Sequence, residues 1–172
     1  MKSLTLPCDL QQLKSLCAGD TVHLSGTVYT ARDAAHKKMH KLLENGKPLP
    51  FDINNQCIYY VGPCPAPNDK PIGSAGPTSS YRMDKFTPEL LDLGLKCIIG
   101  KGDRNSDVVN SLVKNNAVYF TALGGLGALY ASKITKCEVV AFSELLSEAV
   151  YKLEIRDFPV IVAIDSKGKS IY

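Results

Sequence analysis

A segment rich in glycine and hydroxyl groups, Pro71–Asp84, is the first place where this sequence could bind a small anion. Its glycines allow a ligand to approach the backbone closely, its serine and threonine residues supply several hydroxyl groups, and Arg82 supplies a guanidinium group. The segment belongs to a longer irregular stretch, 62–84, and a loop of that length in a compact domain is either functional or disordered. We therefore expect it to bind an anion, the alternative being a flexible linker.

Two further cations stand where a predicted strand ends. Arg32 falls in the first turn of a predicted helix, where a positive charge opposes the helix dipole, so a bound carboxylate would explain it. The alternative is a solvated surface arginine. Lys101 lies between Gly100 and Gly102, directly after another predicted strand. Together Arg32, Arg82 and Lys101 would form a cationic pocket on three separate loops, for which a dicarboxylate is the natural ligand.

The histidines and cysteines do not follow the spacing of a known metal site. His36 and His40 are four residues apart, which gives half a metal site, but no third ligand completes the pattern. The six cysteines include no CxxC pair, and we expect ordinary buried thiols at Cys8, Cys17, Cys57, Cys64, Cys97 and Cys137. We expect no metal on this chain, so the ligands of any iron–sulfur cluster would lie on another chain.

The predicted elements alternate between strand and helix. Strands are expected at 21–29, 57–61, 96–99, 117–123, 138–142 and 160–165, and helices at 9–16, 31–43, 87–94, 106–115 and 144–150. Thr30 and Thr87 are the expected caps of two of these helices. The glycine loop 124–127 does not match a dinucleotide-binding motif and is expected to serve close packing. This order predicts an α/β domain with a mainly parallel sheet, whose ligands bind at the carboxyl ends of the strands.

Composition places the chain among ordinary globular proteins. It has 172 residues, of which 45% are hydrophobic and 22% charged, and a net charge of +3. We expect one domain over residues 1–172, too weakly basic to indicate nucleic acid and without an apolar run of the roughly 18 residues that cross a bilayer. The first residues become polar too soon for a signal peptide, so a cytoplasmic location is expected.

Several motifs together resemble the β subunit of class I fumarate hydratase and L-tartrate dehydratase. The resemblance covers about residues 20 to 165 and rests on Ser25–His36, Gly76–Ser79, Arg82–Asp84, Ile99–Gly102, Gly124–Gly125, Glu148–Val150 and Asp157–Pro159. Three places depart from the family pattern. One is the segment after Gly124–Gly125, which reads Leu-Gly-Ala-Leu in place of an alanine-rich run. Ser79 stands where a second threonine is frequent, and Tyr81 where a smaller residue is common.

This resemblance implies a swivelling β/β/α three-layer domain that forms half of an enzyme. It implies an α subunit, in a heterodimer or an α2β2 assembly, whose three cysteines bind a [4Fe–4S] cluster with one open iron. The implied reaction is the reversible hydration of fumarate to (S)-malate, with that iron acting as a Lewis acid. L-tartrate dehydratase is the alternative enzyme, and a non-catalytic module that binds dicarboxylates for regulation is the alternative of another class.

The resemblance also implies a role for each site residue. Thr78 would be the catalytic base that removes a proton beside a carboxylate. Arg32, Arg82 and Lys101 would hold the substrate carboxylates, with Gly76 beside them in the substrate-binding loop. The last implied residue, His36, would support either Arg32 or the substrate.

Overall fold

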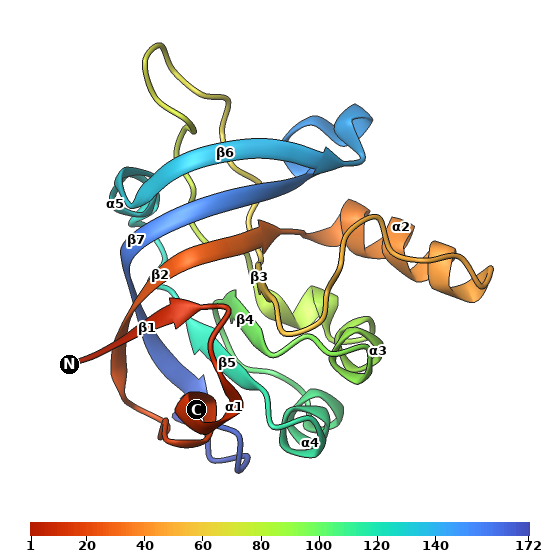
Figure 1. Ribbon diagram of the computed structural model, residues 1–172, viewed down its shortest axis with the longest axis vertical. Coiled ribbons are helices and arrows are strands. Elements are labelled where there is room, and N and C mark those ends of the chain that lie inside the picture. Colours follow the sequence, from red (N-terminus) through yellow and green to blue (C-terminus); the bar gives the residue numbers. More distant parts are fainter.

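The computed structural model describes residues 1–172 as one seven-stranded sheet with helices around it (Figure 1). The strands are β1 (Lys2–Leu6), β2 (Thr21–Thr30), β3 (Cys57–Tyr59), β4 (Cys97–Gly100), β5 (Val118–Thr121), β6 (Ile134–Ala141) and β7 (Val150–Ile164). The α-helices are α1 (Leu10–Lys14), α2 (Asp33–Glu44), α3 (Thr87–Asp92), α4 (Ser106–Lys114) and α5 (Gly127–Ser132), and two 3-10 helices cover Ser80–Met83 and Ser143–Glu148. None of the helices combines the length and apolar character needed to cross a membrane.

The predicted α/β class is confirmed, and the sheet is mixed, with four parallel and three antiparallel strand pairings. The strands β1 to β5 pair in parallel, each with its neighbour in the chain. The long strand β7 runs antiparallel and pairs with β2 along one edge and with β5 along the other. The sheet therefore closes into a small barrel. This continuous closed sheet does not confirm the three separate layers that were expected.

Both faces of the parallel strands are buried, which explains why these strands read as unbroken apolar runs. Alternate residues belong to two separate apolar clusters, so that Tyr59 and Ile99 lie inside the barrel whereas Tyr60 and Ile98 lie outside it. The helices α2, α3 and α4 cover the outer cluster from one side of the barrel (Figure 1). The inner cluster also receives Leu13 of α1 and Tyr130 of α5.

Several element predictions need correction. β1 and α5 were not predicted, and β7 begins ten residues before the expected strand 160–165, at Val150. Its first half alternates buried residues such as Leu153 with charged ones such as Lys152, a strand pattern in a segment for which no element was predicted. The segment expected as helix 144–150 is instead a 3-10 helix followed by the start of β7.

The two expected threonine caps are also wrong. Thr30 is the last residue of β2, where its hydroxyl donates to the carbonyl of Ala149 and accepts from the backbone N–H of Tyr151. Thr87 lies inside α3, and its hydroxyl donates to the carbonyl of Met83. Both hydroxyl groups are buried and bind backbone atoms outside the helix start, which sequence alone does not reveal.

The carboxyl ends of β2, β3, β4 and β5 meet at one end of the barrel, because these strands are parallel. Arg32 follows β2, the segment 60–84 follows β3, and Lys101 follows β4. The segment 60–84 also reaches out past β6 (Figure 1). The barrel thus gathers the predicted site residues at one end, as expected for open parallel sheets.

Candidate functional site

Arg82 and Thr78 are in direct contact. Nη2 of Arg82 donates to Oγ1 of Thr78 at 2.6 Å. The same guanidinium group donates from Nε and Nη2 to the two carboxylate oxygens of Asp33, at 2.9 and 3.2 Å. Asp33 opens α2, where its charge also suits the helix dipole. The guanidinium is thereby held by α2 while it contacts the hydroxyl on the loop after β3.

The contact with Arg82 also keeps Asp33 ionised. Desolvation, the largest single influence, would raise the pKa of Asp33. The hydrogen bonds from Arg82 and from the backbone, together with the positive charges of Arg82 and Arg32, outweigh it, and the pKa lies below its usual value. The pKa of Arg82 is raised, mainly by its hydrogen bond to Asp33. Near neutral pH Thr78 therefore accepts its hydrogen bond from a charged guanidinium group, which favours negative charge on the hydroxyl oxygen.

Arg32 lies across Gly62 and next to Glu148. A Cβ at Gly62 would come within 2.6 Å of Nη1 of Arg32, so glycine alone leaves room for the guanidinium there. Nε of Arg32 lies 3.2 Å from Oε1 of Glu148, an ion pair whose angle is too poor for a hydrogen bond. Glu148 instead accepts the backbone N–H of Ala34 at 3.1 Å. Arg32 thus lies between contacts with Gly62 and with Glu148 of the 3-10 helix before β7.

Lys101 is joined to the Thr78 loop through Ser80. The backbone N–H of Ser80 donates to the carbonyl of Lys101 at 3.0 Å, and the N–H of Lys101 donates to the Ser80 hydroxyl at 3.1 Å. Nζ of Lys101 lies 3.8 Å from where a Cβ at Gly124 would be, at the glycine loop after β5. Lys101 forms no ion pair with a carboxylate. Its ammonium group is therefore the one site cation without an internal counter-ion.

The remaining two predicted residues lie at the edges of this cluster. Gly76 packs beside Gly127, at the start of α5, where Ala75 donates its N–H to the Gly127 carbonyl at 3.1 Å. His36 is only 1% exposed, and its Nδ1 lies 2.9 Å from the carbonyl oxygen of Arg32. Desolvation lowers the pKa of His36 to about 4, so the ring is neutral and Nδ1–H donates to Arg32. The histidine therefore contacts the backbone of Arg32 from within the protein.

Sequence reasoning did not select the two acids of this cluster. Asp33 and Glu148 each face a predicted arginine, so that Arg82 and Arg32 carry internal counter-ions. Both acids had a signal in the sequence, because Asp33 directly follows Arg32 and Glu148 opens one of the motifs of the resemblance. The predicted pocket of three cations is in fact a mixed cluster of three cations and two carboxylates.

The residues of this chain do not fit an iron–sulfur cluster. No three histidine, cysteine, aspartate or glutamate side chains stand close enough together to hold a metal ion. Cys8, Cys97 and Cys57 are neighbours in the core, where hydrogen bonding between thiols, together with burial, raises the pKa of Cys8 and Cys97. Metal ligation needs thiolates, which this environment disfavours.

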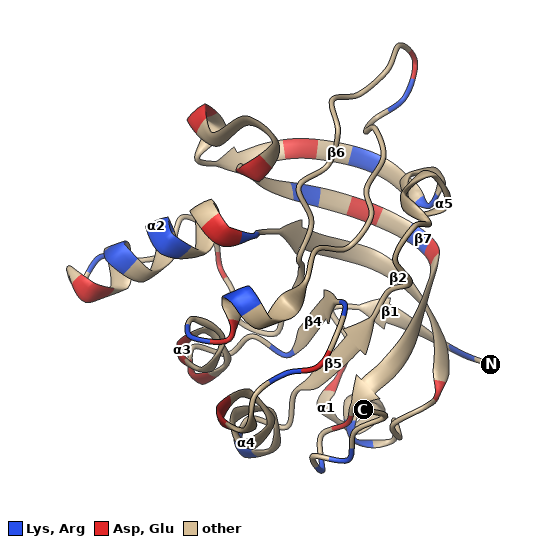
Figure 2. Ribbon diagram, turned by 180° about the vertical axis from the view of Figure 1, so that it is seen from behind, with Lys and Arg blue, Asp and Glu red and all other residues tan.

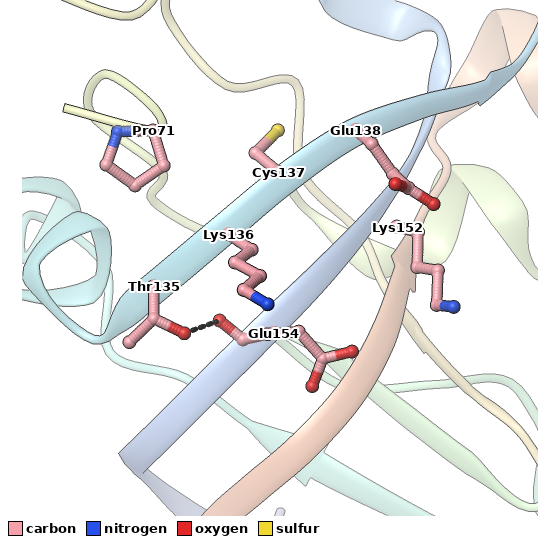
Figure 3. A pocket seen from close by; sticks show the side chains of 7 residues that line it. All are labelled: Pro71, Thr135, Lys136, Cys137, Glu138, Lys152 and Glu154. Carbon is pink, nitrogen blue, oxygen red and sulfur yellow. Dashed lines mark hydrogen bonds between the residues drawn. The ribbon is translucent and has the colours of Figure 1, made fainter.

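A wide pocket of about 790 Å³ lies elsewhere, on β6 and β7, and contains none of the predicted residues (Figure 3). Its charged side chains are cross-strand partners in register, Glu138 with Lys152 and Lys136 with Glu154. Thr135 donates to the Glu154 backbone carbonyl at 3.2 Å. Positive and negative residues alternate along both strands (Figure 2). Such pairs stabilise a sheet, and this accounts for the composition of the pocket.

The sequence comparisons identify one family. A family model described as "Fumarase C-terminus" matches residues 3–172. The chain belongs to the fumarase C-terminus family. The match extends the motif-based resemblance, which was expected over about residues 20 to 165, to both ends of the chain.

Relatives of this fumarase C-terminus chain fall into two groups by length. The chain is 40% identical over 168 residues to a putative L(+)-tartrate dehydratase subunit beta of Methanocaldococcus jannaschii, covering 94% of this chain and 86% of that protein. It is 38% identical over 164 residues to fumarate hydratase 2 of Leishmania major and 37% identical over 165 residues to the anaerobic class I fumarate hydratase of Escherichia coli. It covers only 29% and 30% of those two proteins.

Proposed function

We propose that this chain is the β subunit of a two-subunit hydro-lyase that catalyses the reversible hydration of fumarate to (S)-malate. The observation that carries the proposal is the contact between Thr78 and Arg82, with Asp33 behind the guanidinium and Lys101 on the neighbouring loop. A hydroxyl beside fixed cations suits a reaction that moves a proton next to a carboxylate. Membership of the fumarase C-terminus family supports the same reaction class.

The cations would bind the two carboxylates of the substrate. Arg82 and Arg32 retain guanidinium N–H groups that their acidic partners do not use, and Lys101 has no acidic partner at all. Asp33 and Glu148 offset two of the three positive charges. The site would therefore present a net charge of about +1 to a doubly negative ligand. Orientation by fixed N–H groups would then contribute more to recognition than net charge.

Thr78 would act as the base in the dehydration of malate. The base would be the threonine alkoxide, formed when the hydroxyl proton has passed to solvent, and its oxygen would take a proton from C3. The electron pair left behind would spread onto the adjacent carboxylate and then expel the hydroxyl group from C2. The proton and the hydroxide together make the water that is released. Arg82 would stabilise negative charge on the threonine oxygen, and the remaining cations would stabilise the developing carboxylate charge. Hydration is the same sequence reversed.

We propose that the [4Fe–4S] cluster belongs to a partner α subunit, in a heterodimer or an α2β2 assembly. The residues of this chain do not form a metal-binding group, and the chain matches only about a third of the longer fumarate hydratases. A relative of comparable length is named as a subunit beta, which supports a separate companion chain. The domain would therefore be inactive by itself.

L-tartrate dehydratase is the second candidate, favoured by one observation. Among the relatives described above, the tartrate dehydratase subunit has the highest identity, and this chain covers 86% of its length. Tartrate differs from malate by one hydroxyl group, which one or two hydrogen bonds would recognise. Tyr81, whose side chain is exposed beside Arg82, and Ser79 are the residues of the loop where the two substrates would be distinguished.

The test is reconstitution with the α chain encoded beside it or copurified with it, followed by assays with (S)-malate, fumarate and L-tartrate. We expect the complex to interconvert malate and fumarate and the isolated chain to turn over none of the three. A higher kcat/KM for tartrate would replace the first candidate by the second. Activity of the isolated chain would contradict the two-subunit proposal. Tight dicarboxylate binding without any turnover in the complex would favour a regulatory module.

A further inference from the structure

Arg104 and Asp84 form a buried ion pair that the proposed reaction does not use. Nε of Arg104 donates to Oδ1 of Asp84 at 2.6 Å, and the two side chains are 0% and 7% exposed. Arg104 follows Lys101 by three residues and Asp84 follows Arg82 by two. The pair therefore joins the two loops that carry these cations.

Further contacts of the same pair strengthen this link. Oδ2 of Asp84 accepts the backbone N–H of Asn105 at 2.8 Å, and Nη2 of Arg104 donates to Oγ1 of Thr87 at 2.8 Å. The guanidinium carbon of Arg104 lies 5.3 Å from the ring centre of Tyr60 and 4.9 Å from that of Tyr119. The Asp84 carboxylate thus binds the loop after β4, and the Arg104 guanidinium binds α3.

Tyr119 extends the network to Ser80 and the loop of Lys101. Its hydroxyl lies 2.9 Å from the Ser80 hydroxyl and 2.8 Å from the carbonyl of Gly102. A Cβ at Gly100 would come within 2.0 Å of the Ser80 oxygen, so this close approach requires glycine. The network thus links Tyr60, directly after β3, with Tyr119 of β5 and with both loops.

A buried ion pair is a weak source of net stability, because desolvation of both charges offsets their attraction. Replacing such a pair by apolar side chains of similar size is often neutral or stabilising. Apolar side chains would fix the two loops relative to each other less well than the ion pair does, because they form no directional hydrogen bonds.

We infer that Arg104 and Asp84 are positioning residues, which hold the Thr78–Arg82 loop and the Lys101 loop in one fixed arrangement. The inference rests on the proposed function for its catalytic consequence, but the loop arrangement itself can be tested without activity. A displacement of about 1 Å in a catalytic site can cost about 100-fold in rate. Loss of the pair would therefore impair catalysis although neither residue touches the substrate.

Three variants separate positioning from general stability. Arg104→Lys keeps the charge opposite Asp84 and loses the planar fork that also reaches Thr87. Arg104→Met combined with Asp84→Leu removes both charges and avoids leaving one of them buried alone. Leu112→Ala, in the outer apolar cluster on α4, is the matched control, because it destabilises the same side of the barrel while its side chain forms none of the hydrogen bonds of the network.

Hydrogen exchange of the isolated chain is the first measurement. We expect peptides that cover 78–84 and 101–105 to exchange at least about tenfold faster in both network variants, and to remain at the wild-type rate in Leu112→Ala. Unchanged exchange in Arg104→Lys and in the double variant would overturn the inference. If the double variant does not fold, Arg104→Lys decides the result alone.

Steady-state kinetics of the reconstituted complex is the second measurement. Positioning predicts that KM rises and kcat falls together, with kcat/KM about 100-fold lower in the double variant and less reduced in Arg104→Lys. A purely structural role would lower the amount of active enzyme and leave KM unchanged. Wild-type kinetics in a folded double variant would overturn the inference, whereas a wild-type complex without hydro-lyase activity would overturn the proposed function and leave the exchange result standing.

Discussion

Asp33 holds Arg82 through two hydrogen bonds, while the same guanidinium donates to Thr78. The acid belongs to α2 and the hydroxyl to the loop after β3, so this arginine joins two elements at the point where the proposed proton transfer occurs. Three predictions concern this group and its neighbouring cations, a fourth concerns a close contact, and a fifth concerns pH.

The first prediction is that Asp33→Asn lowers kcat/KM of the reconstituted enzyme about tenfold. The amide loses the charge and one of the two acceptor positions, and a hydrogen bond to a charged group contributes roughly 1.5–3 kcal/mol before solvent exposure reduces it. Arg82→Lys should be more harmful, since an ammonium cannot bind Asp33 and Thr78 in the same geometry. Wild-type kinetics in Asp33→Asn would contradict the role of the acid.

The second prediction is that Thr78→Val lowers kcat by a factor of about 100 to 10,000 and changes KM little. The range is that expected for loss of a general base, and valine keeps the shape of the side chain without its hydroxyl. Thr78→Ser is the matched control and should retain most of the activity. An unchanged kcat in Thr78→Val would remove Thr78 from the proposed role.

The third prediction is that Lys101→Met lowers kcat/KM about 100-fold, in line with the loss of one preorganised charged donor. The ammonium group has no internal carboxylate partner, so a substrate carboxylate is its natural ligand. Lys167→Met, on the exposed turn after β7, controls for the general change in net charge. Equal effects of the two substitutions would count against a specific role for Lys101.

The fourth prediction is that Gly62→Ala weakens substrate binding and leaves the fold intact. The new Cβ would displace the guanidinium of Arg32, which lies 2.6 Å away and can move as the end of a flexible side chain. We expect KM to rise about tenfold, the lower range for loss of a charged hydrogen bond. Thermal unfolding of the isolated chain checks the fold, and an unchanged KM would show that Arg32 does not bind substrate from this position.

The fifth prediction concerns stability against pH. His36 has a pKa of about 4 when folded, lowered by desolvation from 6.5, so protons bind preferentially to the unfolded chain between these values. Stability should therefore fall as the pH drops from 6.5 to 4, by about 3 kcal/mol in all. Denaturant unfolding of the isolated chain at several pH values measures this loss.

Two variants test whether His36 causes this loss of stability at low pH. His36→Gln should largely abolish the loss between pH 6.5 and 4. His40→Gln should preserve it, because the pKa of His40 is raised, chiefly by its hydrogen bond to Glu89, and both its folded and unfolded forms are protonated in that range. The pKa of Asp33 is lowered from 3.8, so its protonation reduces stability only below about pH 3.8, outside this range. An equal pH dependence in wild type and His36→Gln would contradict this assignment.

Much of the fold was predictable because its strong local signals agree with the final packing. The apolar runs at β3, β4 and β5 are buried on both faces, so their sequences contain little else. The length of β7 was not predictable in the same way. Its charged residues suit either a helix surface or an exposed strand face, and the choice depends on β6 and β2 lying on its two sides. The closed barrel follows from those distant pairings.

The residues of the candidate site also differ in how far sequence alone could predict them. Lys101 could be selected from its residue type and its place after a strand, and Thr78 from the family motif that contains it. Their counter-ions and supports could not, because Glu148 reaches Arg32 from a segment more than 100 residues later, and Arg104 is buried although its residue type favours the surface. Such partners are defined by three-dimensional proximity alone.

The position of β7 has a consequence for how this protein is made. Lys152 pairs with Tyr29, and Ile161 with Thr21, so the last long strand closes a structure begun by the first quarter of the chain. Contacts over so many intervening residues form slowly, and a growing polypeptide still attached to the ribosome lacks them. Until β7 has been synthesised, β2 and β5 each have an unpaired edge, which can pair with the strands of other nascent chains.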